Sequence, residues 1–169
     1  MSKYKDTIYA LSTPTGKSAI AVIRISGDQS LNILKKISSI KNIIPNKIKL
    51  TLLKFEKQII DQVLVVYFKK PHSFTGDEMV EINCHGSIAI INKISQILEI
   101  LGTRLAEPGE FTRRSLINDK IDLLQTEGLA DLINSETEKQ RSMAISGLSG
   151  RLSVFVNETN EQLKQWSFY

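Results

Sequence analysis

Two charged residues interrupt apolar, strand-like runs and are the first candidates for binding chemistry. Arg24 lies in Ala19–Ile25, an alternating run that predicts a strand with Arg24 on the same face as hydrophobic side chains. Glu81 lies in a second predicted strand, Glu78–His85, where an unpaired carboxylate would be costly. A guanidinium keeps its charge at pH 7 and therefore needs an anion or several carbonyl groups. The two residues either form an internal ion pair or face a polar ligand, and the sequence leaves both interpretations open.

Lys120 is the third candidate, because it stands in a loop after Asn118 and Asp119 and just before a predicted helix. Simple solvation is enough to explain a lysine there. Together with Arg24 and Glu81, however, it would supply one carboxylate and two cations. A folate would suit this set, since it has ring N–H donors for the carboxylate and an acid tail for a cation. Composition and spacing alone do not single out folate among anionic ligands.

The remaining residues predict no catalytic centre. No paired general acid and base, no nucleophile with a base and no metal-ligand cluster is recognisable, so the expected role is binding and orientation of a carrier. Cys84 is the only cysteine, which excludes an internal disulfide and a Cys-pair metal site. Adjacent strand residues point to opposite faces, so Cys84 and His85 are not expected to meet, and a buried core cysteine is predicted.

Gly16-Lys17-Ser18 resembles part of a nucleotide-binding P-loop, but position 11, where that motif needs glycine, is leucine. A P-loop also runs from a strand into a helix, whereas this segment precedes the predicted strand 19–25. We therefore predict no GTPase or ATPase site in this chain.

The charge distribution is asymmetric, because residues 1–57 hold eleven Lys and Arg against three Asp and Glu although the net charge is only +4. A basic half is compatible with an anionic partner such as RNA, but aromatic side chains for base stacking do not cluster there. Lysines at 47, 49, 54 and 57 are also typical of a protected edge strand. The longest apolar runs fall short of the roughly 20 residues of a membrane span, and no secretory signal is recognisable. We expect a cytoplasmic protein without a membrane partner.

Periodicity predicts an α+β fold with a mixed or antiparallel sheet and packed helices. Further predicted strands cover 47–55, 59–67 and 103–106, and predicted helices cover 31–40, 87–101, 110–118, 122–134 and 136–166. The last helix has weak points at Gly147 and Gly150 and carries an apolar stripe of Ile145, Leu148, Leu152, Phe155 and Leu163. Too few residues remain to cover this stripe, so we expect a truncated chain that stops inside a helical bundle.

Six separated motifs carry a resemblance to a known family: Asp6–Gly16, Val22–Gly27, Ser73–Asp77, Val80–Gly86, Glu107–Thr112 and Asn118–Leu123. In this order they resemble the N-terminal portion of the tRNA modification GTPase family MnmE, also called TrmE, and the similarity covers essentially all 169 residues. The resemblance implies a folate-binding and homodimerising α+β domain over 1–118. It also implies that 119–169 are the first helices of a truncated helical domain. The GTPase domain that family members carry is missing.

The resemblance further implies residue roles and partners. The family positions that contact a tetrahydrofolate derivative, 5-formyl- or 5,10-methylene-tetrahydrofolate, match Arg24, Glu81 and Lys120. Family members act with an FAD-dependent partner of the MnmG (GidA) type and install a carboxymethylaminomethyl-type group on the wobble uridine, U34, of tRNA. GTP hydrolysis with K+ and Mg2+ belongs to the missing domain, so this chain is expected neither to hydrolyse GTP nor to modify tRNA alone.

Two alternatives belong to other function classes. A stand-alone folate-dependent transferase, similar to the aminomethyltransferases, would need a catalytic carboxylate near the one-carbon unit, and Glu81 is the only candidate. Substitution of Glu81 would then abolish turnover and leave binding intact, whereas in a binding module it would abolish binding. A basic RNA-binding module built on residues 1–57 would instead show a steep dependence of binding on salt.

Overall fold

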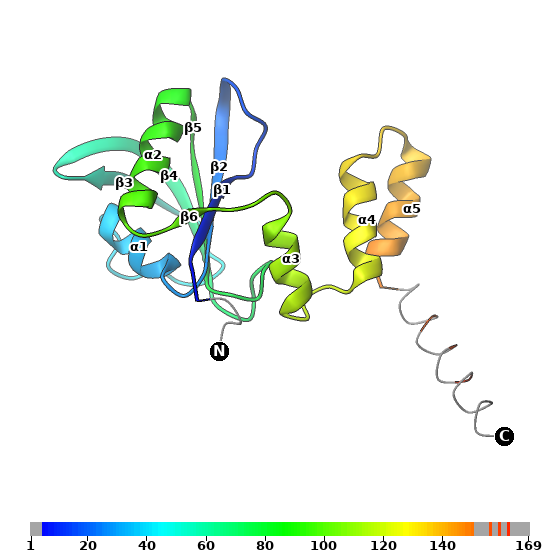
Figure 1. Ribbon diagram of the computed structural model, residues 1–169. Helices are drawn as coiled ribbons and strands as arrows, with labels where there is room; N and C mark the ends of the chain where they lie inside the picture. The colour runs from blue at the N-terminus through cyan, green and yellow to red at the C-terminus, as the bar shows by residue number, and fades with distance from the viewer. Residues whose placement is uncertain (1–4, 151–155, 157–158, 160–161, 163–169) are drawn as a thin grey trace. The chain divides into compact units, whose positions relative to one another are not determined.

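The computed structural model describes residues 5–150, 156, 159 and 162 (Figure 1). The chain divides into two compact units, Met1–Asn118 and Asp119–Tyr169. The first unit is built from a sheet and helices, and the described start of the second unit is helical. The α+β fold class predicted from periodicity is therefore confirmed.

Among the residues that the structure describes, the first unit contains a mixed six-stranded sheet and three helices. Its strands, in sheet order, are β3 (Lys49–Phe55), β4 (Gln58–Phe68), β5 (Met79–Gly86), β2 (Ser18–Ser26), β1 (Ile8–Leu11) and β6 (Arg104–Leu105). Neighbouring strands are antiparallel, except that β1 and β6 are parallel. The helices are α1 (Ser30–Ile37), α2 (Ile88–Ile100) and α3 (Glu110–Ile117).

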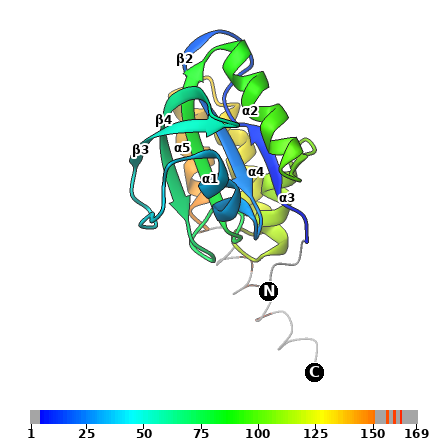
Figure 2. The same ribbon diagram turned by 90° about the vertical axis from the view of Figure 1, so that its left-hand side faces the viewer.

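The hydrophobic core lies between one face of the sheet and helices α1 and α2 (Figure 2). Strand residues such as Ile23, Val65 and Ile82 are at most 1% exposed and belong to one buried cluster with Leu34 of α1 and Leu98 of α2. This pattern follows from the two-residue period of a strand, which sends every second side chain to the same face. Burial of these apolar side chains holds the two helices on the sheet.

The opposite side of the sheet, which we call the outer face, carries the side chains that alternate with the core residues. One cross-strand row on it consists of Val66, Glu81, Arg24 and Ala10. The next row consists of Leu50, Leu64, Asn83 and Val22. Leu50 is 59% exposed and Leu64 is 43% exposed, so the helices of the first unit leave this part of the outer face open.

The strands and helices predicted for the first unit are confirmed to within a few residues at each end. β3 lies at the edge of the sheet, as the lysines around it predicted, which favours edge protection over RNA binding as their role. The turn from β3 to β4 consists of Glu56 and Lys57, whose φ angles of 47° and 70° lie in the left-handed region. A two-residue turn of this kind matches the twist of the hairpin strands.

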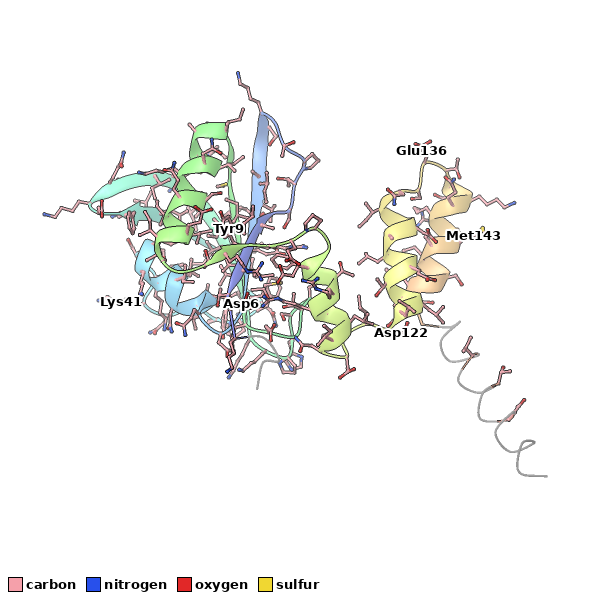
Figure 3. The ribbon with its side chains drawn as sticks, in the orientation of Figure 1. Asp6, Tyr9, Lys41, Asp122, Glu136 and Met143 are labelled. Carbon is pink, nitrogen blue, oxygen red and sulfur yellow. The ribbon has the colours of Figure 1, made fainter. Side chains whose placement is uncertain are left out.

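The second unit begins with two helices, α4 (Leu123–Ile133) and α5 (Glu138–Leu148), which pack against each other. Each starts at a capping box, in which the side chain of Asp122 or Thr137 accepts a hydrogen bond from a backbone N–H of the first turn. Figure 3 shows Asp122 at the start of α4 and Glu136 in the turn that precedes α5. These caps satisfy N–H groups that have no partner within the helix.

Close packing of these two helices depends on Gly128 of α4. A Cβ atom at this position would lie 2.7 Å from the backbone nitrogen of Leu148, which is too close for any other residue without movement. The prediction of one helix over 136–166 is wrong, because α5 ends at Leu148 and Gly150 follows with a left-handed φ of 75°. A glycine in this conformation is typical of a helix C-terminus. Three residues of the predicted apolar stripe lie outside the described residues, namely Leu152, Phe155 and Leu163.

Candidate functional site

The structure brings Arg24 and Glu81 together on the outer face. They occupy facing positions on the antiparallel strands β2 and β5, and Arg24 Nε donates a hydrogen bond of 2.7 Å to Glu81 Oε1. The same strand alternation that buries Ile23 and Ile82 in the core sends these two charges to the opposite side. The internal ion pair, one of the two interpretations of the sequence, is therefore present.

The ion pair leaves several hydrogen-bonding groups unused. Within the part of the chain that the structure describes, the two terminal amino groups of Arg24 and Oε2 of Glu81 make no hydrogen bond. The Arg24 side chain is 36% exposed and that of Glu81 is 19% exposed, so a ligand can reach both. Guanidinium donors beside a carboxylate acceptor suit a planar group that has donors and acceptors along one edge.

Phe74 forms one side of this site. Its ring centroid lies 5.9 Å from Arg24 Cζ, within the range of a cation–π contact. The residue is half-buried and belongs to the loop between β4 and β5. No local periodicity indicates the contact, because Phe74 and Arg24 are far apart in the chain. The only sequence signal was the position of Phe74 inside the motif Ser73–Asp77.

Lys120 belongs to the second unit and lies in the loop between α3 and α4. Its side chain is exposed, and it follows Asp119, whose φ of 56° lies in the left-handed region. Of the three predicted site residues, the structure thus unites Arg24 and Glu81 in the first unit. The contribution of Lys120 stays a prediction.

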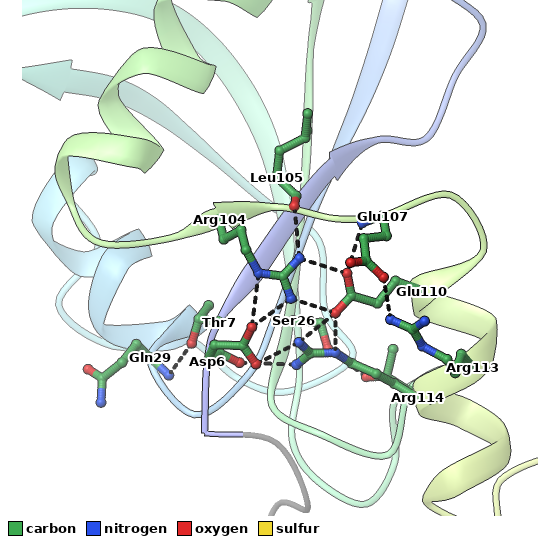
Figure 4. Close-up of polar contacts among 11 residues, drawn as sticks. Asp6, Thr7, Ser26, Gln29, Arg104, Leu105, Glu107, Glu110, Arg113 and Arg114 are labelled. Atoms are coloured by element: carbon green, nitrogen blue, oxygen red, sulfur yellow. Dashed lines mark hydrogen bonds and ion pairs between the residues drawn. The ribbon is translucent and has the colours of Figure 1, made fainter.

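A second cluster of charges, which we call the α3 network, joins the start of the described chain to β6 and α3 (Figure 4). Arg114 is fully buried and donates to Asp6 Oδ1 at 2.8 Å and to Glu110 Oε1 at 2.9 Å. Arg104 donates to the same two carboxylates, at 2.6 Å and 2.7 Å. Glu110 is only 1% exposed, so its charge depends on these arginines for compensation.

The sequence signal for the α3 network is weak. Glu110 and Arg114 have the i,i+4 spacing of a helical ion pair, which is common on exposed helices as well. Asp6 and Arg104 come from distant parts of the chain, so only the fold unites the four residues. The network holds α3 beside the loop of Phe74, whose carbonyl accepts a hydrogen bond of 2.7 Å from Ser115 Oγ.

The α3 network is expected to make stability sensitive to acid. Hydrogen bonds from Arg104, with further contributions from the Glu107 backbone N–H and Arg114, outweigh burial and lower the pKa of Glu110 from 4.5 to about 2. Because the folded-state pKa lies below the unfolded value, this stabilisation is complete above pH 4.5 and is lost as the pH falls towards 2. We expect a loss of about 2 kcal/mol, allowing for solvent screening at the partly exposed Arg104.

Urea unfolding at pH 7 and at pH 3 measures this loss in the wild type and in Glu110→Gln. The variant should be less stable at pH 7 and should lose less of its remaining stability between the two pH values. An identical pH dependence in both proteins would assign the acid sensitivity to other carboxylates.

The thiol and imidazole side chains do not form a catalytic pair. Cys84 is 3% exposed, and burial raises the pKa of its thiol to about 11, so the nucleophilic thiolate is absent at neutral pH. His85 is exposed on the other face, where its Nδ1 lies 2.7 Å from Asp61 Oδ1. The predicted buried core cysteine is confirmed. Among the described residues, no group of three or more side chains is arranged to hold a metal ion.

The segment Gly16-Lys17-Ser18 leads directly into strand β2, which begins at Ser18. It therefore lacks the helix N-terminus with which a P-loop binds phosphate, as its sequence context predicted. Separately, no helix in the described part of the chain is long and apolar enough to span a membrane.

The first unit is thus an α+β domain that carries the Arg24–Glu81 ion pair on the outer face of its sheet. In a comparison of the sequence with protein families, the profile described as "GTP-binding protein TrmE N-terminus" matches residues 7–120. The chain belongs to the MnmE/TrmE family of tRNA modification GTPases and corresponds to the N-terminal portion of its members.

Three relatives, each described as tRNA modification GTPase MnmE, illustrate the match. The protein of Fervidobacterium nodosum is 47% identical over 160 residues, which are 88% of this chain and 34% of the relative. That of Neorickettsia sennetsu is 47% identical over 158 residues, 93% of this chain and 28% of the relative. That of Lactococcus lactis is 41% identical over 161 residues, 94% of this chain and 35% of the relative. The chain spans about a third of the length of these curated relatives.

Proposed function

We propose that the chain is the folate-binding and homodimerisation part of a tRNA modification GTPase. The observation that carries the folate assignment is the Arg24–Glu81 pair, whose unused donors and acceptor lie on an accessible face. Lys120 is the third residue of the proposed site. The cofactor is a tetrahydrofolate derivative, in the 5-formyl or 5,10-methylene form, which the site binds and orients while the cofactor supplies the one-carbon chemistry.

The chemistry of these side chains suits the parts of a folate. A pterin ring has adjacent N–H donors, which a carboxylate such as Glu81 accepts in strong, charge-assisted hydrogen bonds. The terminal amino groups of Arg24 suit a carbonyl oxygen or a carboxylate beside those donors. A lysine such as Lys120 suits the glutamate tail, because an ammonium group binds a carboxylate as a point charge.

A homodimer is the second part of the proposal. The outer-face row that contains Leu50 and Leu64 is exposed, and Val22 adds a half-buried apolar side chain in β2. Apolar surface that neighbours share across a sheet is typical of an interaction site. A second copy of the chain on this row would remove that surface from water and would close the open side of the Arg24–Glu81 site.

The activity of the whole protein is proposed from the family. The full-length protein would hydrolyse GTP with K+ and Mg2+ and, with an FAD-dependent partner of the MnmG type, install a carboxymethylaminomethyl-type group on U34 of tRNA in the cytoplasm. The folate bound by this chain would supply the one-carbon unit. In this scheme the chain binds the carrier and assembles the dimer, and it leaves GTP hydrolysis to the rest of the protein.

The other function classes have less support. A folate-dependent aminomethyltransferase would need a catalytic carboxylate near the one-carbon unit, and the only candidate, Glu81, is paired with Arg24 through Oε1. An RNA-binding module would need the lysines of residues 1–57 to form a binding surface, whereas those around β3 lie at a sheet edge.

Calorimetric titration with 5-formyltetrahydrofolate tests the folate assignment, and sedimentation equilibrium of the same sample tests the dimer. We expect saturable binding and the mass of a dimer. The control ligand is p-aminobenzoylglutamate, which has the acid tail but no pterin ring for Glu81 and should bind much more weakly. A folded dimer that binds neither compound would disprove the folate assignment and leave assembly as the role. A monomer at every concentration would disprove the dimer.

A further inference from the structure

The outer face changes from covered to open along the strands, and Phe74 lies at this boundary. The row formed by Ile8, Ser26 and Met79 is buried, at 0%, 0% and 2% exposure. The loop 73–77 covers this row, since Thr75 Oγ1 lies 2.7 Å from Ser26 Oγ. The adjacent row contains Arg24 and Glu81, both of which are partly exposed. The Arg24–Glu81 ion pair therefore lies next to the part of the outer face that the loop 73–77 covers.

Hydrogen bonds hold the loop 73–77 in position. Ser115 Oγ donates to the Phe74 carbonyl and Asn118 Nδ2 donates to the Thr75 carbonyl, each at 2.7 Å. Within the loop, Ser73 Oγ donates to the carbonyl of Asp77 at 2.6 Å. Ser73, Thr75 and Ser115 are all buried, so these bonds are shielded from water and make the loop rigid.

Core packing does not explain the position of Phe74. The residue is not among those that pack against the buried cluster between the sheet and helices α1 and α2. It is half-buried, and its ring lies against the guanidinium of Arg24 instead. An aromatic ring that a rigid loop holds beside unused polar groups has the character of a ligand-pocket wall.

We propose that Phe74 is the aromatic wall of the Arg24–Glu81 site and contacts the heteroaromatic ring of the bound ligand. Ser115 is a positioning residue that acts through the loop of Phe74. The inference rests on the proposed function, because it requires a ligand with a flat ring on the ion pair. Stacking on an aromatic side chain is favourable for any heterocycle, so the wall selects ring-bearing ligands over flexible acids of equal charge.

Titration of Phe74→Leu with 5-formyltetrahydrofolate tests the wall. Leucine keeps apolar volume but has no π face, so we expect the affinity to fall about ten-fold, whereas Phe74→Tyr should stay within about two-fold of the wild type. Phe55→Leu is the matched control, because Phe55 is also half-buried but packs against the core. Its affinity should equal that of the wild type. Circular dichroism and thermal melting establish that each variant is folded.

The outcomes separate the wall from the proposed function. Weaker binding by Phe74→Leu, with normal binding by Phe55→Leu, supports the wall. Wild-type affinity in a folded Phe74→Leu would overturn the wall and leave the proposed function intact. Failure of the folded wild type to bind would overturn both.

A double-mutant cycle tests the positioning role of Ser115. Ser115→Ala should weaken binding by a few-fold in the wild-type background and should have no further effect in Phe74→Leu, because the loop then carries no aromatic ring. Additive losses of affinity would overturn the positioning role. A purely structural contribution would lower the melting temperature equally in both backgrounds and would not produce this coupling in affinity.

Discussion

Replacement of Arg24 by alanine is expected to abolish saturable binding of 5-formyltetrahydrofolate. The substitution removes the two terminal amino groups, which make no hydrogen bond among the described residues, and leaves the half-buried Glu81 carboxylate without its partner. Loss of one member of such a pair costs about 2–5 kcal/mol, or roughly thirty-fold to several-thousand-fold in dissociation constant. Calorimetric titration of the wild type and the variant under identical conditions measures the change.

Two further variants show how the pair acts. Glu81→Gln keeps an acceptor oxygen but removes the charge, so in a binding module it should also weaken binding strongly. In an aminomethyltransferase it would leave binding intact. Arg141→Ala is the matched control, because Arg141 is 51% exposed and pairs on α5 with the exposed Glu138. Its affinity should be unchanged. Near wild-type affinity in a folded Arg24→Ala would show that the ligand binds elsewhere.

Replacement of Arg114 by methionine is expected to lower the free energy of unfolding by about 3–5 kcal/mol. Methionine fills much of the same volume, so the loss is mainly electrostatic. It leaves the buried Glu110 with one arginine fewer and removes the donor to Asp6 Oδ1. The hydrogen bond of 3.0 Å from Arg114 to the backbone carbonyl of Asp6 is lost as well. Urea unfolding at pH 7, followed by circular dichroism, measures the difference.

Arg113→Met is the matched control for this prediction. Arg113 is the next residue on the same helix, but its side chain is 50% exposed and pairs with Glu107, which is 62% exposed. Exposed ion pairs contribute at most about 1 kcal/mol, because water and salt screen them. Equal destabilisation by the two substitutions would contradict the assignment of the large effect to burial.

Helix α3 connects the α3 network to the candidate ligand site. Arg114 ties the helix to Asp6, and the neighbouring Ser115 binds the loop that carries Phe74. Buried charges that are fully paired hold their element in one position. Such pre-organisation lowers the conformational entropy that ligand binding would otherwise cost. The stability of α3 is thus expected to support the proposed pocket.

The particular ligand could not be predicted from the charges of Arg24, Glu81 and Lys120. One carboxylate and two cations suit many anionic ligands, and folate enters through the family motifs. The structure limits the groups that Arg24 and Glu81 can offer to a ligand, because it shows which of their atoms stay unpaired. It places Lys120 in the second unit, in the loop between α3 and α4.

The amino-acid sequence by itself determined most of the secondary structure of the first unit and the faces on which the residues of β2 and β5 lie. Alternation placed Arg24 opposite the core-facing Ile23, and it separated Cys84 from His85, because the two-residue period of a strand is a local property. The sequence also ruled out a P-loop at Gly16-Lys17-Ser18. The prediction of one helix over 136–166 was wrong, because α5 ends at Leu148 and Gly150 has a left-handed φ. Hydrophobic periodicity does not detect such a helix end.

Only the tertiary structure decided which of these residues meet. The sheet order β3-β4-β5-β2-β1-β6 sets β2 beside β5, and this neighbourhood pairs Arg24 with Glu81. The loop after β4 then lays Phe74 against the same guanidinium, and α3 closes the charge network with Asp6. Such contacts join residues far apart in the chain, so they form only when the fold brings those residues together. Local sequence patterns therefore do not predict these contacts.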